Sequence, residues 1–157
     1  MRTATLALAA ILALIGWGCG ATTRGAGITA DPTLATASVT FMTRDDGKDD
    51  DSAIAAQIMD DSGRLSAEGT VVDTEFDSQT VSTPLALTMT RTVYASDLDE
   101  ARVRLRFTPD GRDSWTFDMR MTLGLSDGTQ RSYFWQGLRM DEAAPERSVT
   151  LLSGRLP

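Results

Sequence analysis

The chain has 157 residues, enough for one domain with a buried core, and carries 22 acidic against 15 basic side chains, for a net charge of −7. It has no histidine and one cysteine, which excludes Ser-His-Asp and Cys-His catalysis, histidine-ligated zinc, intramolecular disulfides and CxxC redox pairs. Its 14 arginines and single lysine are scattered and outnumbered by acids, so we expect no nucleic-acid partner.

The N-terminal segment has the pattern of an export signal. Arg2 is followed by an apolar run over residues 6–15 and then by small residues around Gly16 and Gly18. A positive start, a short apolar stretch and small residues are typical of a secretory signal peptide. The run is shorter than the roughly 20 residues that cross a bilayer as a helix. We therefore predict export, with residues 1–18 as the signal.

The single cysteine lies at the end of this signal. The segment Ile15-Gly16-Trp17-Gly18-Cys19 resembles a bacterial lipobox, the site at which a lipoprotein signal is cleaved and its cysteine lipidated. This resemblance implies a lipid anchor at Cys19 and, because Gly20 follows it, a bacterial outer-membrane lipoprotein that faces the periplasm or the cell surface. The alternative is ordinary cleavage after Ala21, which would discard Cys19.

Residues 19–33 are rich in Thr, Gly and Ala and predict a flexible tether. From residue 34 onward, apolar and polar residues alternate, and turn-forming residues recur about every ten positions. The alternation predicts eight strands, at residues 35–41, 54–58, 65–72, 85–89, 103–107, 114–123, 130–140 and 149–152. One helical turn fits near residues 96–102. The fold class expected for residues 34–157 is all-β, an antiparallel β-sandwich of about eight strands.

Acidic residues gather in the loops that follow the odd-numbered strands. In successive antiparallel strands these loops share one end of the molecule, and oxygen-rich loop clusters are the ligands that Ca²⁺ prefers. We therefore predict a calcium site there, with six candidate ligands from two loops: Asp45, Asp46, Asp49, Asp51, Asp110 and Asp113. The alternative is a solvated acidic surface, partly neutralised by Lys48 and Arg112.

Two other features have a functional and a structural interpretation. The hairpin over residues 114–140 carries aromatic residues on both faces, so Tyr133 and Trp135 are candidates for a sugar- or lipid-binding surface, or else are core residues. Arg102, Arg104 and Arg106 form one face of a strand that could meet an anionic lipid or polysaccharide, or else is solvated.

The segments 43–51, 109–118 and 125–128, with their DDGKDDD and PDGRDSWTFD sequences, resemble a recurring pattern in secreted bacterial β-sandwich proteins of no established activity. In architecture, the acidic loops are also similar to those of calcium-dependent membrane-binding domains and lipoxygenase-homology domains. That likeness implies calcium and a lipid or protein partner.

We thus expect an exported, lipid-anchored binding or structural module rather than an enzyme, with an unknown protein, lipid or glycan partner. A carbohydrate- or lipid-binding module that uses the aromatic hairpin is the alternative, and a carboxylate-based hydrolase is the least favoured one.

Overall fold

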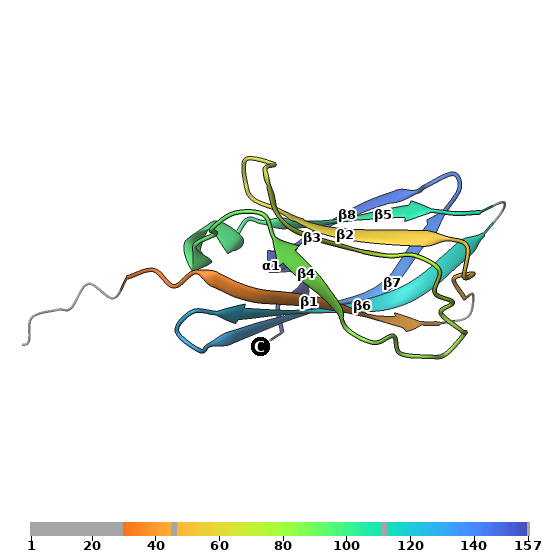
Figure 1. Cartoon of the computed structure of the whole chain (residues 1–157), viewed down its shortest axis with the longest axis horizontal. Coiled ribbons are helices and arrows are strands. Elements are labelled where there is room, and N and C mark those ends of the chain that lie inside the picture. The colour runs from red at the N-terminus through yellow and green to blue at the C-terminus, as the bar shows by residue number, and fades with distance from the viewer. Residues whose placement is uncertain (1–29, 45–46, 111–112, 157) are drawn as a thin grey trace, which may run out of the picture.

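The computed structural model describes residues 30–44, 47–110 and 113–156 (Figure 1). It contains eight strands: β1 (Leu34–Thr43), β2 (Ala53–Met59), β3 (Leu65–Val71), β4 (Leu85–Met89), β5 (Arg102–Thr108), β6 (Ser114–Leu125), β7 (Gln130–Asp141) and β8 (Glu146–Thr150). Two short helical turns, η1 (Ala95–Leu98) and α1 (Leu151–Gly154), complete the elements. No helix in the described ranges is long and apolar enough to cross a membrane.

The eight strands form one antiparallel sheet in the order β7-β6-β1-β4-β3-β2-β5-β8, which curls into a nearly barrel-shaped fold. The short strand β4 joins its two halves. Leu85–Leu87 pair with β1, whereas Thr88 and Met89 pair with β3. The predicted all-β antiparallel class is confirmed. The separation into two sheets that defines a sandwich is not observed, because β4 makes the hydrogen-bonded ladder continuous.

The interior is filled by the alternate residues that the sequence predicts. In β6, Trp115, Phe117, Met119 and Met121 are fully buried, whereas Arg120 is exposed. Side chains of a strand point to opposite faces in turn, so in β1, β2, β5 and β6 one apolar face lines the interior of the curled sheet. Near one end of the core, a cluster of aromatic rings packs together; its members are Phe41, Phe76, Trp115 and Phe117.

The predicted strand over residues 149–152 is replaced from Leu151 onward by a helical turn. The last strand, β8, runs from Glu146 to Thr150, and α1 follows at once. Thr150 ends the strand because its hydroxyl accepts a hydrogen bond from the backbone N–H of Ser153 and caps the turn. The element α1 contacts both edge strands, β7 and β8, so it covers part of the opening between them.

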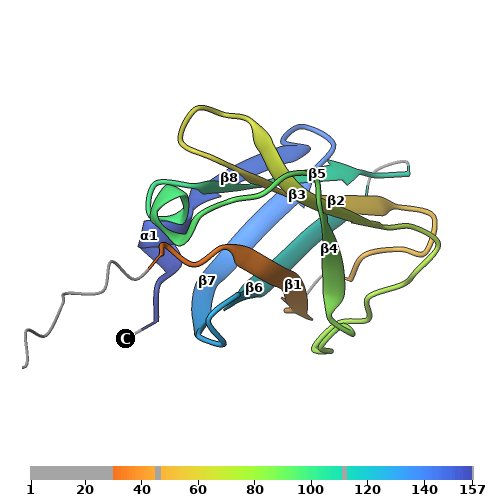
Figure 2. The same cartoon turned by 60° about the vertical axis from the view of Figure 1, so that its left-hand side comes forward.

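The two ends of the fold are formed by different turns and loops (Figure 2). β1 begins at the end formed by η1, α1 and the turns after β2 and β6, which we call the proximal end. The loops after β1, β3, β5 and β7 lie at the opposite, distal end. The alternation of strand direction was expected to gather these four loops together, and the pairing of the strands places them so.

Candidate functional site at the acidic end

The distal end carries most of the acidic residues in the described loops. They are Asp49, Asp50 and Asp51 after β1, Asp73, Glu75 and Asp77 after β3, Asp110 and Asp113 after β5, and Glu142 after β7. The loops of the proximal end carry fewer: Asp60, Asp61, Asp97, Asp99, Glu100 and Asp127. One end of the molecule is therefore the more negative.

Lys48 lies at the centre of this acidic end with its side chain fully buried. Its Nζ donates hydrogen bonds to the backbone carbonyls of Asp49 (2.7 Å) and Thr74 (2.5 Å). It also lies 5.4 Å from the centroid of the Phe76 ring, within the range of a cation–π interaction. The lysine thus joins the loops after β1 and β3 from the inside. It was expected only to neutralise charge at the surface.

The position of Lys48 puts two opposing effects on its ammonium group. Burial lowers its pKa from the ordinary value of 10.5, and the carboxylates of Asp113, Asp50, Asp49 and Asp51 act in the other direction by favouring the charged form. Lys48 thus places a basic group inside the acidic end of the molecule, among carboxylates that favour its charged form.

Ser52 connects the loops after β1 and β5. Its hydroxyl donates to Oδ2 of Asp113 (2.8 Å) and accepts from the backbone N–H of Asp110 (3.0 Å). The backbone N–H of Asp49 points at the same carboxylate oxygen at 3.4 Å. Asp113 is thereby used in holding the two loops together. Ser52 could not be singled out from the sequence, because a lone serine after an acidic run gives little signal.

Asp51 and Asp110 form a close carboxyl pair between these two loops. The hydrogen bond to Asp110 is the largest cause of a raised pKa at Asp51, followed by burial and the charge of Asp110. Two carboxylates at hydrogen-bond distance repel unless a proton or a cation lies between them.

The predicted calcium ligands are only partly brought together. Asp45 and Asp46 lie outside the described residues. Within residues 30–44, 47–110 and 113–156, no three potential metal-binding side chains converge on one point. Of the four described candidates, Asp51 and Asp110 form the carboxyl pair and Asp113 accepts from Ser52. Asp49 contributes its backbone to the same network.

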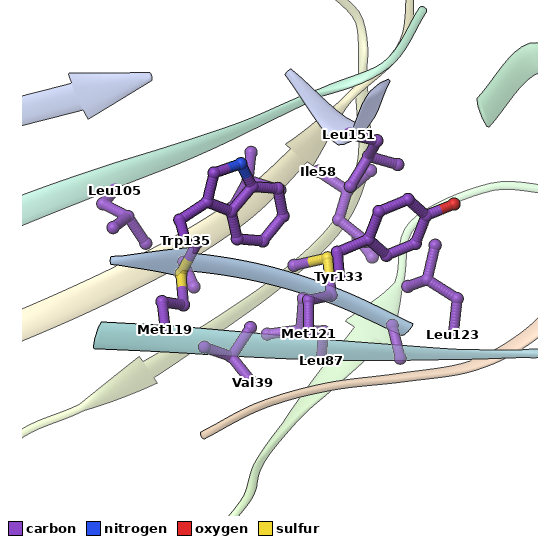
Figure 3. Close-up of a cluster of buried hydrophobic side chains, with 14 of the residues drawn as sticks. Val39, Ile58, Leu87, Leu105, Met119, Met121, Leu123, Tyr133, Trp135 and Leu151 are labelled. Carbon is purple, nitrogen blue, oxygen red and sulfur yellow. The ribbon is translucent and has the colours of Figure 1, made fainter. Parts of the chain in front are cut away.

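The two aromatic candidates point into the protein (Figure 3). Tyr133 and Trp135 are 3% and 7% exposed, and their rings stack with centroids 6.1 Å apart among aliphatic core side chains. The indole Nε1 of Trp135 donates to the hydroxyl of Ser153 in α1 (3.1 Å). The proposed exposed platform is therefore corrected to the core interpretation, because both residues lie on the inner face of β7.

A second polar cluster, at the proximal end, surrounds Asp60. This buried carboxylate accepts from the hydroxyl of Ser62, from the backbone and side chain of Arg64, and from Arg91. The bond from Ser62 and those from Arg64 hold the pKa of Asp60 at about 2. The turn after β2 is therefore fixed by this buried carboxylate.

Cys19 and residues 1–18 lie outside the described residues, as does most of the expected tether. No protein-family model matches the chain, and no curated protein matches it in sequence.

Proposed function

We propose that the chain is an exported domain of the bacterial cell envelope, held to a membrane by lipid on Cys19, that acts as a binding or structural module rather than as an enzyme. The observation that carries this proposal is the polarity of the fold. β1 starts at the proximal end, whereas the acidic loops lie at the distal end. An anchor that precedes β1 would hold the proximal end towards the membrane and present the acidic end to the surroundings.

The anchor is tested by expressing the chain in a bacterium and comparing it with Cys19→Ser. We expect the parent protein in the membrane fraction, with a mass for its N-terminal peptide that includes acyl chains on Cys19. The variant should leave the membrane fraction. An unlipidated N-terminus just after Ala21 in the parent protein would instead establish ordinary cleavage and end the lipoprotein proposal.

We also propose that the acidic end binds Ca²⁺, with Asp51 and Asp110 as the first ligands. Their carboxyl pair supports this, because a divalent cation bound between the two carboxylates would offset the repulsion that contributes to the raised pKa of Asp51. A ligand that binds the folded state alone raises the melting temperature. The melting temperature should therefore be higher with calcium than with chelator in the parent protein and in the proximal control Glu100→Gln. In Asp49→Asn/Asp51→Asn it should not change.

Equal melting temperatures of the parent protein with calcium and with chelator would contradict the calcium proposal and leave Lys48 as the only cationic group proposed for this end.

The resemblance to secreted β-sandwich proteins belongs to the same proposal. In that interpretation, β4 would be the strand shared by two layers, one built on β1, β6 and β7 and the other on β2, β3, β5 and β8. The alternative is that the fold belongs with flattened barrels, and the continuity of the sheet through β4 supports this alternative equally well.

A further inference from the structure

An open hollow of about 400 Å³ lies on the outer surface beside the turn that follows β2. It is lined by Met59, residues 60–63, Arg102, Arg104 and Ser148. These residues come from the neighbouring strands β2, β5 and β8 (Figure 1). In the strand register, Arg102 lies opposite Met59, and Arg104 lies opposite Ser148, so these side chains share the outer face. The hollow is of the size that accepts a small organic ligand.

Arg104 is held in place here by a neutral partner rather than by a carboxylate. Its Nε and Nη2 both donate to the side-chain oxygen Oε1 of Gln57, at 2.9 and 2.7 Å. Gln57 is itself oriented, because its Nε2 donates to Glu68 at 3.1 Å. A neutral amide thus holds the guanidinium in place while its remaining N–H donors stay available for a ligand.

Arg102 is an exposed cation two residues away on the same face of β5. Among the described residues, the ion pairs involve neither Arg102 nor Arg104. Two guanidinium groups on alternate residues of one strand can flank the same oxyanion, and each can bind it with paired N–H donors.

The carboxylates beside the hollow have different roles. Asp60 is already bound by both Arg64 and Arg91. Asp61 lines the hollow and accepts only its neighbour's backbone N–H, from Ser62 at 2.8 Å, among the bonds described for its side chain. A carboxylate without a cationic partner repels a polyanionic ligand, but it accepts hydrogen bonds from the hydroxyl groups of a ligand. The walls therefore match a ligand that carries hydroxyls next to one acidic group.

We propose that this hollow binds an acidic sugar. Arg102 and Arg104 hold its carboxylate or phosphoryl group, and Asp61 and Ser148 bind its hydroxyls. The site lies apart from the acidic distal end and does not depend on the lipid anchor. It also gives a carbohydrate-binding role to the outer face of β5 rather than to the buried ring of Trp135.

The test is calorimetric titration of the full chain in detergent at low salt, with glucuronate and glucose 6-phosphate as probes. Glucose, acetate and inorganic phosphate serve as comparison ligands. We expect saturable binding of both acidic sugars, and weaker binding of all three comparison ligands. Arg102→Gln/Arg104→Gln should weaken binding of the acidic sugars by about tenfold or more, because the charge-assisted bonds are lost. Arg120→Gln, which removes an exposed arginine on the outer face of β6, should leave it unchanged.

Two further variants keep the result interpretable. Arg102→Gln alone removes a side chain with no described partner, so it should fold as the parent does and still weaken binding. Asp61→Asn should weaken the binding of the acidic sugars, because an acceptor for their hydroxyls is lost, and should strengthen the binding of inorganic phosphate, because a repelling charge is removed. The proposal is overturned if neither acidic sugar binds, or if the double variant binds them as the parent does. Binding of acetate or phosphate as tight as that of the sugars would overturn the assignment to a sugar.

Discussion

Lys48 and Phe76 face each other at the distal end of the fold. The ammonium of Lys48 lies 5.4 Å from the centroid of the Phe76 ring, and the two backbones exchange hydrogen bonds of 3.0 and 2.8 Å. This pairing fixes the chain's only lysine inside the protein, although the three residues that follow it, Asp49, Asp50 and Asp51, are acidic and exposed. The loops after β1 and β3 are thereby joined by one residue pair through both backbone and side chain.

Replacing Lys48 with Met should therefore destabilise the protein. The carbonyl oxygens of Asp49 and Thr74 would lose their donor inside the protein, at a cost of about 1–3 kcal/mol. The free energy of unfolding in urea measures this loss. Arg120→Met removes an exposed cation from β6 and should change stability by no more than about 0.5 kcal/mol. Equal stability of Lys48→Met and the parent would show that the buried ammonium is not needed.

The same burial predicts that Lys48 is chemically protected. An amine-reactive ester should leave it unmodified in the native protein, because the reagent cannot reach a fully buried Nζ. In urea the same residue should be acylated quickly. Peptide mass mapping before and after unfolding distinguishes the two states, since no other lysine can be confused with it. Native labelling at the unfolded rate would mean that the loops open freely.

Asp60 should make stability depend on pH in the acid range. Its pKa is lowered from 3.8 to about 2 in the folded protein, so the charged form is favoured by folding. Its contribution is fully present above pH 3.8 and is lost as the pH falls towards 2. Asp60→Asn should therefore melt well below the parent at pH 6, and the difference should shrink between pH 4 and pH 2. Asp61→Asn, the neighbouring exposed acid, should follow the parent throughout. A difference in melting temperature between Asp60→Asn and the parent that stays constant with pH would mean that the substitution acts through packing rather than through charge.

Much of the fold can be predicted from the alternation of apolar and polar residues along the strands. Val103, Leu105 and Phe107 alternate with arginines, and this pattern alone predicts β5 and its buried face. Strand direction then follows from the connections, which is why the acidic loops could be assigned to one end. The continuity of the sheet could not be predicted in this way, because it depends on β4 changing partner between Leu87 and Thr88. Such a switch is a long-range pairing with no local signature.

The candidate site was harder to predict than the fold. Tyr133 and Trp135 share one face of β7, and a two-residue period cannot tell which face of a hairpin is inside. Lys48 gave a misleading signal, because a lone lysine among aspartates usually lies in solvent. Its burial depends on Phe76 and Thr74, which come from a loop more than twenty residues further along the chain.

Gly154 should tolerate no side chain. A Cβ at this position would overlap the indole of Trp135, which is packed in the core under α1. Gly154→Ala forces one of them to move, and overpacking of this kind costs about 1–3 kcal/mol. Urea unfolding measures the loss of stability, and the difference in tryptophan fluorescence between parent and variant reports the displacement of Trp135. Ser153→Ala is the matched control, because it removes the hydrogen bond to the indole without adding volume. An unchanged stability in Gly154→Ala would show that α1 is loosely held.

Asp51→Asn should stabilise the protein when no divalent cation is present. The pKa of Asp51 is raised by its contact with Asp110, so folding disfavours its charged form. The pair therefore costs stability at neutral pH, and the cost disappears as the pH falls and Asp51 takes up a proton. An amide can donate to Asp110 without adding a second charge. With chelator at pH 7, Asp51→Asn should melt a few degrees above the parent, and the two melting temperatures should converge in acid.

The control is Asp50→Asn, which removes the neighbouring exposed charge and should raise the melting temperature by less. A lower melting temperature for Asp51→Asn under these conditions would mean that the carboxyl pair holds the loops together rather than straining them. Added calcium discriminates further, because a cation bound between Asp51 and Asp110 would raise the parent above the variant.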